Sequence, residues 1–243
     1  NIHRSNKIIQ NILSDKTNND FEKNREIINK FYSIGFQFLS NGEMIYNNIY
    51  LQYNPVKQKK ATTLWESKID DQFNFKPEVV KNHYTNDKEI FLQDQTNAIY
   101  LVSNSGRILW KHRLNEAINS EVYQIDYYKN GKYQLMFSTK NYLHLIDRNG
   151  NYVDKYPVKL KSPSTAGMSL FDYAKNLDYR VFIPCSDSKV YLYEKSGKIN
   201  TGWKFGKTES VVKHPVQHFL ADGKDYIVFN DSLQVYILNR RGE

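Results

Sequence analysis

The chain has 243 residues and a mass of 28.7 kDa, enough for one large all-β domain or two small domains. Aromatic residues, mainly 19 Tyr and 13 Phe, make up 14% of the chain, which excludes a disordered protein and favours strands over helices. The formal net charge of +8 permits an acidic partner without requiring one. The densest basic cluster, within residues 57–60, is too small for a nucleic-acid-binding arm, so no nucleic-acid partner is expected.

A single cysteine, Cys185, excludes an intramolecular disulfide, and its apolar surroundings predict a buried small hydrophobe. No run of about 18 apolar residues occurs, so the sequence predicts no transmembrane span. No signal peptide is visible. Because the sequence begins without Met, we expect a processed or trimmed piece of a longer chain, and the missing signal then says nothing about location.

Residues 1–60 differ in pattern from the rest and are predicted to form an N-terminal helical segment followed by a β-hairpin. Apolar residues within 5–13 recur at helical spacing, residues 14–20 read as a polar loop, and Asp20 is expected to cap a second short helix. Two apolar runs within 31–54 flank Asn41-Gly42, a strong hairpin signal. Residues 55–60 form a loop and the expected domain boundary.

Residues 61–243 repeat with a period of about 45 residues. A turn glycine follows an apolar strand at intervals of 44, 47 and 45 residues, an aromatic residue recurs at intervals of 45, 46 and 47, and a hairpin lies upstream of each glycine. The glycines are Gly106, Gly150, Gly197 and Gly242, and the aromatic residues are Trp65, Trp110, Tyr156 and Trp203. Each repeat therefore contains four predicted strands.

A four-stranded unit of this length is typical of a β-propeller blade, whose two apolar faces are buried by its neighbours. A β-sandwich or open barrel is the alternative fold, although neither requires a fixed period. The sequence predicts four repeats, 62–106, 107–150, 151–197 and 198–242. The strand around Trp65 could complete the last blade and close a four-bladed ring; alternatively, the hairpin at 31–54 contributes to an extra blade, or the chain stops mid-blade.

The strings QIDYYKNGKYQLMFSTKNYLHLIDRNGNYVDKYPV and SLFDYAKNLDYRVFIPCSDSKVYLYEKSGKINTGWKF resemble the repeats of bacterial quinoprotein-like and FG-GAP-like β-propellers. The resemblance covers about residues 61–243. More closely, the sequence is similar to envelope-associated bacterial proteins in which a domain of unknown function precedes such repeats. The resemblance implies a propeller fold and a location in the cell envelope, and it implies no activity.

In FG-GAP relatives the hairpin loop binds Ca²⁺ through alternate Asp side chains. Here one ligand position holds Tyr128, Ala174 and Leu220, which cannot serve, so turn capping is the expected role of the remaining Asp and Asn residues. Four residues at the first loop position raise a sharper hypothesis, because two imidazoles and two carboxylates converging at the axis could hold Zn²⁺ or another divalent ion. These candidates are His83, Asp126, Asp172 and His218.

The recurring aromatic residues and glycines are interpreted as structural residues at blade contacts, with a ligand-stacking ring as the alternative. The fuller tryptophan-docking motif and a vicinal cysteine pair are missing, so no quinone or other cofactor is expected. No nucleophile elbow, phosphate loop or zinc-protease motif occurs. The sequence therefore predicts a non-enzymatic binding scaffold that presents loops to a protein or polysaccharide partner. The alternative is a divergent hydrolase or lyase with an ionisable cluster in the central funnel.

Overall fold

A computed structural model describes residues 14–28, 31–53, 63–73 and 75–243. The chain forms two compact units, Asn1–Leu64 and Trp65–Glu243, and each is described by itself. The helix predicted within residues 5–13 lies outside the described residues. Among the helices that are described, none is both long and apolar enough to cross a membrane.

The described part of the first unit contains two helices, α2 (Asp15–Lys23) and α3 (Arg25–Ile28). The prediction of a polar loop over residues 14–20 was wrong, because α2 begins at Asp15 rather than at Asp20. Ser14 precedes the first turn, where its Oγ lies 2.9 Å from Thr17 Oγ1. Serine is favoured at this position, and the Asp15 carboxylate and the Lys23 ammonium match the positive and negative ends of the helix dipole.

The predicted hairpin is present as strands β1 (Phe31–Ser40) and β2 (Ile45–Tyr53). Asn41 Oδ1 accepts hydrogen bonds from the backbone N–H groups of Glu43, at 3.2 Å, and Met44, at 2.9 Å, which fixes a four-residue loop. Large apolar side chains on this hairpin are half or more exposed; they include Phe36, Phe38, Ile45, Ile49, Tyr50 and Tyr53.

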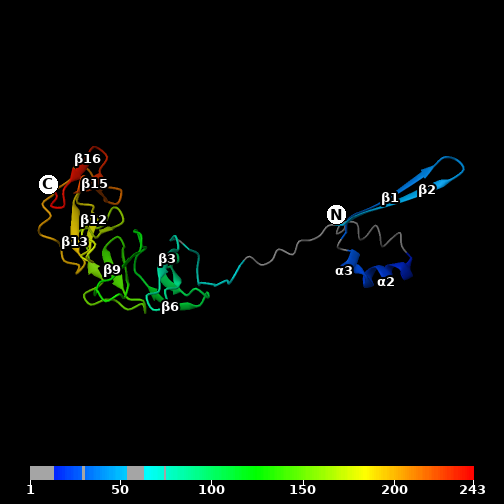
Figure 1. Ribbon diagram of the computed structural model, residues 1–243, viewed down its shortest axis with the longest axis horizontal. Coiled ribbons are helices and arrows are strands. Elements are labelled where there is room, and N and C mark those ends of the chain that lie inside the picture. The colour runs from blue at the N-terminus through cyan, green and yellow to red at the C-terminus, as the bar shows by residue number, and fades with distance from the viewer. Residues whose placement is uncertain (1–13, 29–30, 54–62, 74) are drawn as a thin grey trace. The chain divides into compact units, whose positions relative to one another are not determined.

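The second unit consists of four antiparallel sheets that follow one another in chain order (Figure 1). The first sheet contains β3 (Glu78–Lys81), β4 (Lys88–Gln93), β5 (Ala98–Val102) and β6 (Ile108–Arg113). The second sheet contains β7 (Tyr123–Ile125), β8 (Gln134–Ser138), β9 (Tyr142–Ile146) and β10 (Val158–Lys159). The third contains β11 (Ser169–Phe171), β12 (Arg180–Pro184) and β13 (Val190–Glu194), and the fourth contains β14 (Gln217–Ala221), β15 (Lys224–Asn230) and β16 (Val235–Leu238). The unit is all-β, as predicted.

Two details of the predicted blade need correction. Only the first two sheets have four strands, because the segment after β13 makes a single bridge, Tyr193 to Ile199, and β16 is followed by a turn. The aromatic strand closes a sheet instead of opening it, since β6, which carries Trp110, pairs with β5 across the Gly106 turn. No strand pairing joins the first sheet to the fourth within the part of the chain that is described.

Apolar clusters fill the three interfaces between consecutive sheets. The strand pairs at their centres occupy equivalent positions in successive sheets and are 0–3% exposed; they are Phe91 with Leu101, Met136 with Leu145, and Phe182 with Leu192. Period-2 alternation lets each strand serve both faces of its sheet, so each inner sheet is buried on two sides. Cys185 is buried as predicted, and burial raises the pKa of its thiol to about 12.

The recurring aromatic residues lie against the glycine turn of the following sheet. An atom at the Cβ position of Gly150 would lie 2.9 Å from Trp110 Cδ2, and Gly106 and Gly242 are similarly close to Trp65 and Trp203. All three glycines have positive φ angles, between 80° and 86°. The fourth pair, Tyr156 and Gly197, makes a different contact.

At that remaining turn Val158, rather than Tyr156, lies against Gly197. The Tyr156 hydroxyl donates to the Lys195 carbonyl at 2.6 Å, while Trp110 Nε1 donates to the carbonyl of Arg148 at 2.7 Å. Both acceptors lie two residues before the turn glycine. The two aromatic side chains therefore hold equivalent turns by different atoms.

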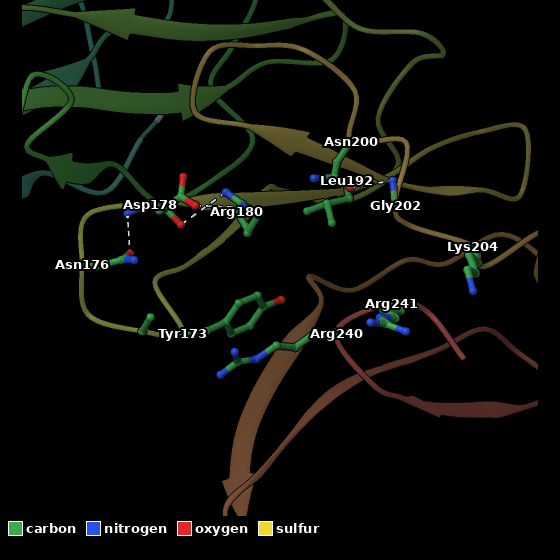
Figure 2. A pocket seen from close by; sticks show the side chains of 11 residues that line it. Tyr173, Asn176, Asp178, Arg180, Leu192, Asn200, Gly202, Lys204, Arg240 and Arg241 are labelled. Carbon is green, nitrogen blue, oxygen red and sulfur yellow. Dashed lines mark hydrogen bonds and ion pairs between the residues drawn. The ribbon is translucent and has the colours of Figure 1, made fainter.

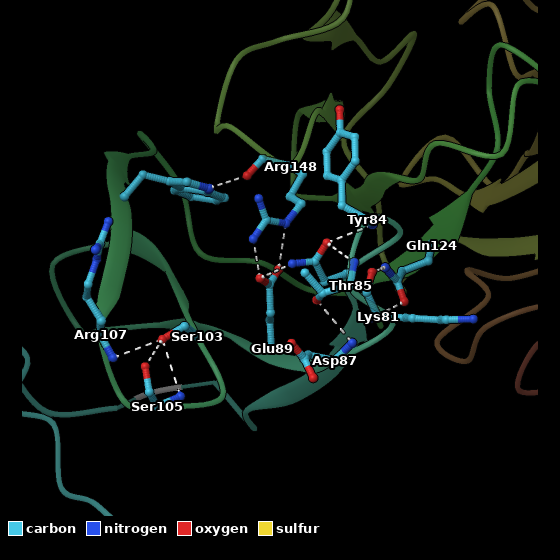
Figure 3. A network of polar contacts seen from close by, with 12 residues as sticks. Lys81, Tyr84, Thr85, Asp87, Glu89, Ser103, Ser105, Arg107, Gln124 and Arg148 are labelled. Carbon is cyan, nitrogen blue, oxygen red and sulfur yellow. Dashed lines mark hydrogen bonds and ion pairs between the residues drawn. The ribbon is translucent and has the colours of Figure 1, made fainter.

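A polar network also joins the first two sheets (Figure 3). The Gln124 side chain pairs with the backbone of Lys81, accepting from its N–H at 2.6 Å and donating to its carbonyl at 2.9 Å. Arg148 forms two hydrogen bonds with the buried carboxylate of Glu89, which also accepts from Asn82 Nδ2 at 3.0 Å. These contacts fix the spacing of neighbouring sheets where apolar packing alone would allow them to slide.

Candidate functional site

Three of the four residues of the hypothetical axial metal ring act within their own hairpin, and His83 contacts the neighbouring hairpin. Asp126 accepts from the backbone N–H groups of Asn130 at 3.0 Å and Gly131 at 2.8 Å. Asp172 accepts in the same way from Asn176 at 3.1 Å and Leu177 at 2.8 Å. A carboxylate between two backbone donors caps a turn, the role expected from the loop sequences.

The two histidines also have protein partners, one in the neighbouring sheet and one in the same hairpin. His83 Nδ1 accepts from the Tyr133 N–H at 3.2 Å, and His218 Nε2 lies 2.7 Å from Asp225 Oδ1. His83 Nε2 is buried without a hydrogen-bond partner, and burial lowers the pKa of this imidazole, with smaller effects from Arg148 and Lys132. Across the described ranges no three His, Cys, Asp or Glu side chains lie close enough to share a metal ion. The structure does not bring the four candidates together.

Residues of β3, β7 and β11, together with Pro215 and Val216 just before β14, line a cavity of about 560 Å³. Its ionisable groups are Lys76, Glu78, Glu121 and Tyr123, with Lys76 Nζ 3.8 Å from Glu78 Oε1, and its lining contains neither His nor Cys. Acid-base or nucleophilic catalysis uses positioned side chains within hydrogen-bond reach of one another. No observation at this cavity favours the hydrolase or lyase alternative.

A cleft of about 430 Å³ between the third and fourth sheets gathers basic side chains (Figure 2). We call it the basic cleft; it is lined by Tyr173, Ala174, Asn176, Asp178, Arg180, Leu192, Asn200, Gly202, Lys204, Arg240 and Arg241. Four of these side chains are cationic and one is anionic. The resulting positive potential suits a negatively charged ligand.

Three capped turns position the lining of the basic cleft. The loop between β11 and β12 is held by Asp172. Asn200 Oδ1 accepts from Gly202 N–H at 2.8 Å, and Asn239 Oδ1 accepts from the backbone N–H groups of Arg241 at 2.8 Å and Glu243 at 3.1 Å. Because local hydrogen bonds fix each turn, the cleft is preorganised before any ligand binds.

Most of the cations in the basic cleft are partly neutralised. Arg180 lies 2.9 Å from Asp178, and this hydrogen bond raises the pKa of the guanidinium and lowers the pKa of the carboxyl group. Lys204 pairs with Glu243 at 2.5 Å. Arg240 pairs with Asp225 and lies 4.8 Å above the Tyr173 ring.

Arg241 differs from these three cations. No carboxylate lies within ion-pair distance of its guanidinium in the part of the chain that the structure describes. Sequence reasoning missed the basic cleft because its cations come from segments far apart in the chain. The adjacent pair Arg240-Arg241, directly before a turn glycine, was the only local signal.

No family model matches the sequence, and no curated protein matches it. Two solved structures of BBS1N in complex with ARL6DN, soaked with lead or with mercury, have TM-scores of 0.52 and are 9% and 10% identical in sequence. Each match covers 71% of this chain and 52% of that chain. The C-terminal domain of Pseudomonas aeruginosa PilY1 has a TM-score of 0.48 at 9% identity, over 70% of this chain and 50% of that chain.

The chain spans about half the length of these solved chains. At such identities the likeness concerns the fold alone. The successive antiparallel sheets of this chain, packed face to face, have a β-propeller-like fold.

Proposed function

We propose that this protein is a non-enzymatic binding scaffold in the cell envelope, in which propeller-like sheets hold the basic cleft open to an acidic segment of a protein partner. The observation that carries the proposal is the guanidinium of Arg241, which has no carboxylate within ion-pair distance among the described residues and lies with three further cations in one preorganised cleft. A protein partner is supported by the solved BBS1N structure, which was determined in complex with ARL6DN. The envelope location is supported by the family resemblance of the repeats.

The chemistry of the basic cleft suits carboxylates. A guanidinium presents parallel N–H donors that match the two oxygens of Asp or Glu, and charge-assisted hydrogen bonds of this kind are stronger than neutral ones. The Tyr173 ring supplies an apolar surface beside them, and the amides of Asn176 and Asn200 add neutral donors and acceptors. We therefore expect binding that weakens as salt screens the charges.

A fluorescein-labelled peptide of ten glutamates tests this site by fluorescence anisotropy at 50 and 300 mM NaCl. Arg241→Gln should weaken binding about fivefold to tenfold at low salt, in line with the loss of one charge-assisted hydrogen bond. Arg107→Gln is the matched control, because Arg107 is exposed and lies outside the basic cleft. Equal effects of the two variants would show nonspecific attraction and contradict the proposal.

Polygalacturonate in the same assay distinguishes the class of partner. The proposal expects the peptide to bind more tightly than the polysaccharide at equal carboxylate concentration. Tighter, Arg241-dependent binding of polygalacturonate would instead identify an acidic polysaccharide as the ligand and overturn the assignment to protein.

A further inference from the structure

Three turns of the structure contain an asparagine followed by a glycine. They are Asn41-Gly42, Asn130-Gly131 and Asn149-Gly150. The backbone nitrogen after an asparagine can attack Cγ of the side-chain amide, and glycine favours this step because it has no Cβ to obstruct the approach. All three asparagines are exposed, so access to solvent does not distinguish them. The three pairs differ in how the glycine nitrogen is held.

The glycine nitrogens of the second and third pairs are fixed by hydrogen bonds of ordinary length. Gly131 N–H donates to Asp126 Oδ2 at 2.8 Å, and Gly150 N–H donates to the carbonyl of Asp147 at 3.1 Å. The nitrogen must lose its proton before it attacks, and a neighbouring carboxylate disfavours the negative charge that results. The Trp110 indole also lies against Gly150, which restricts movement of that turn. Both turns therefore oppose the reaction.

Gly42 in the hairpin loop is held more loosely. Its N–H donates to Ser40 Oγ at 3.3 Å, which is longer than the usual range for such a bond. No described atom lies within 4 Å of the Cβ position of this glycine. The Gly42 nitrogen is therefore easier to deprotonate and to move than its two counterparts.

The Asn41 side chain is also polarised for attack. Its Oδ1 accepts from the backbone N–H groups of Glu43 at 3.2 Å and Met44 at 2.9 Å. The ring closed by the Glu43 hydrogen bond includes the Gly42 nitrogen, so the side chain folds back over the peptide bond that attacks it. Negative charge develops on Oδ1 as the nitrogen adds to Cγ, and two backbone donors already point at that oxygen. The same loop thus holds a free nucleophile and a stabilised oxyanion.

We propose that Asn41 is a site of spontaneous deamidation, whereas the turns around Asn130 and Asn149 protect those residues. The Gly42 nitrogen gives its proton to a hydroxide ion and forms a bond with Asn41 Cγ. The bond from Cγ to Nδ2 breaks, and ammonia leaves with a proton taken from water. A water molecule then adds to one carbonyl carbon of the succinimide ring and breaks its bond to the Gly42 nitrogen, which yields aspartate or isoaspartate.

The products change the loop between β1 and β2. Both products add a negative charge, and isoaspartate also adds a carbon atom to the backbone. Ser40 with Ile45 is the last strand pair before the loop, so the added length lies directly beside the strand register. The hairpin therefore acquires a covalent change that accumulates with time.

Incubation of the full 243-residue chain at pH 8.5 in water enriched in oxygen-18 tests the proposal. Pepsin digestion and mass spectrometry count the heavy oxygen at each site, and chromatography separates isoaspartate from aspartate. Asn41 should react about tenfold faster than Asn130, in line with the charge-assisted hydrogen bond that holds Gly131. Gly42→Ala should slow the reaction at Asn41, because a Cβ then obstructs the nitrogen. Equal rates at the three sites in the folded protein overturn the proposal.

Two further measurements separate the effect of the fold from that of the local sequence. In concentrated guanidinium chloride the three sites should react at similar rates, since each asparagine precedes a glycine. Asp126→Ala should raise the rate at Asn130 roughly tenfold, because it removes the acceptor of the Gly131 N–H. Unchanged rates at Asn41 and Asn149 in this variant show that the rest of the fold is intact. A preference for Asn41 that persists in denaturant, or an unchanged rate at Asn130 in Asp126→Ala, overturns the proposal.

Discussion

Arg148 in the second sheet holds the carboxylate of Glu89 in the first sheet with both a terminal guanidinium nitrogen and Nε, the latter at 3.1 Å. The Glu89 side chain is 3% exposed, and Asn82 occupies part of its remaining hydrogen-bonding capacity. The pair therefore couples two sheets through a charge that would be costly to bury alone.

Removing the arginine should destabilise the protein strongly. Arg148→Met keeps the bulk of the side chain but leaves the Glu89 carboxylate buried without its partner, at a cost of about 3–5 kcal/mol in the free energy of unfolding. The double variant Arg148→Met with Glu89→Gln should regain more than half of that loss. Urea unfolding measures both, and additive losses in the double variant would contradict coupling between the two residues.

Alanine substitutions at two glycines should separate the effect of backbone conformation on the free energy of unfolding from the effect of packing. Gly131→Ala adds a methyl group with no atom within 4 Å at a φ of 77°, so only conformational strain of about 1–2 kcal/mol is expected. Gly150→Ala at a φ of 86° adds contact with the Trp110 indole, and should cost about 1–3 kcal/mol more. Thermal unfolding of the two variants checks the order, and equal losses would exclude a packing role for Trp110 at this turn.

Turn capping by Asp126 should be measurable as stability. Asp126→Ala removes the buried carboxylate that accepts from two backbone N–H groups of an exposed turn and should cost about 2 kcal/mol. Asp126→Asn keeps one acceptor oxygen and should lose less. Asp154→Ala, at an exposed site, should stay within about 0.5 kcal/mol of wild type in the same chemical denaturation assay.

His144 should make stability depend on pH. Burial lowers the pKa of this imidazole to about 4, nearby His112 lowers it further, and Glu116 acts in the opposite direction. The unfolded chain, with a pKa near 6.5, binds the proton first as pH falls, so the contribution of neutral His144 is complete above pH 6.5 and is lost between pH 6.5 and 4. The loss is on the order of 3 kcal/mol.

His144→Tyr isolates this effect from that of His83, whose pKa is also lowered by burial. Tyr100, Tyr191 and Tyr236 occupy the equivalent position in the other sheets, so the repeat accommodates the phenol. Urea unfolding at pH 7.5 and pH 5 should show a smaller loss of stability at pH 5 in the variant than in the wild type. An equal loss in both proteins would assign the pH dependence to other groups.

The strands of the repeat could be predicted because their signals are local. Alternating apolar residues and a turn glycine identify β5, β9, β13 and β16 wherever the sheets lie in space. The boundaries of each sheet within the repeat were harder to predict. Trp110 belongs to the first sheet by strand pairing, but it also contacts Gly150 in the second sheet. The sequence repeat alone does not show which of the two sheets Trp110 pairs with and which it packs against.

The basic cleft could not be predicted from the spacing of residues in the sequence. Arg180, Lys204 and Arg241 meet only because two neighbouring sheets bring the start of β12, a connecting segment and a turn to one place. The roles of Asp126 and Asp172 were ambiguous for a different reason, since alternating oxygen side chains suit both a metal loop and a capped turn. The backbone N–H groups that occupy these carboxylates become visible only in the folded hairpin.

The contacts of Trp110 with both the first and the second sheet affect how the second unit unfolds locally. When the first sheet unfolds, the second sheet loses the contact between the Trp110 indole and the Gly150 turn. The stability of the successive sheets is therefore a sum of interactions between neighbouring sheets. Such a chain frays from its ends. The slowest amide exchange should therefore occur in β8, β9 and β12, which have ordered neighbours on both sides, and protection should decline stepwise toward β16.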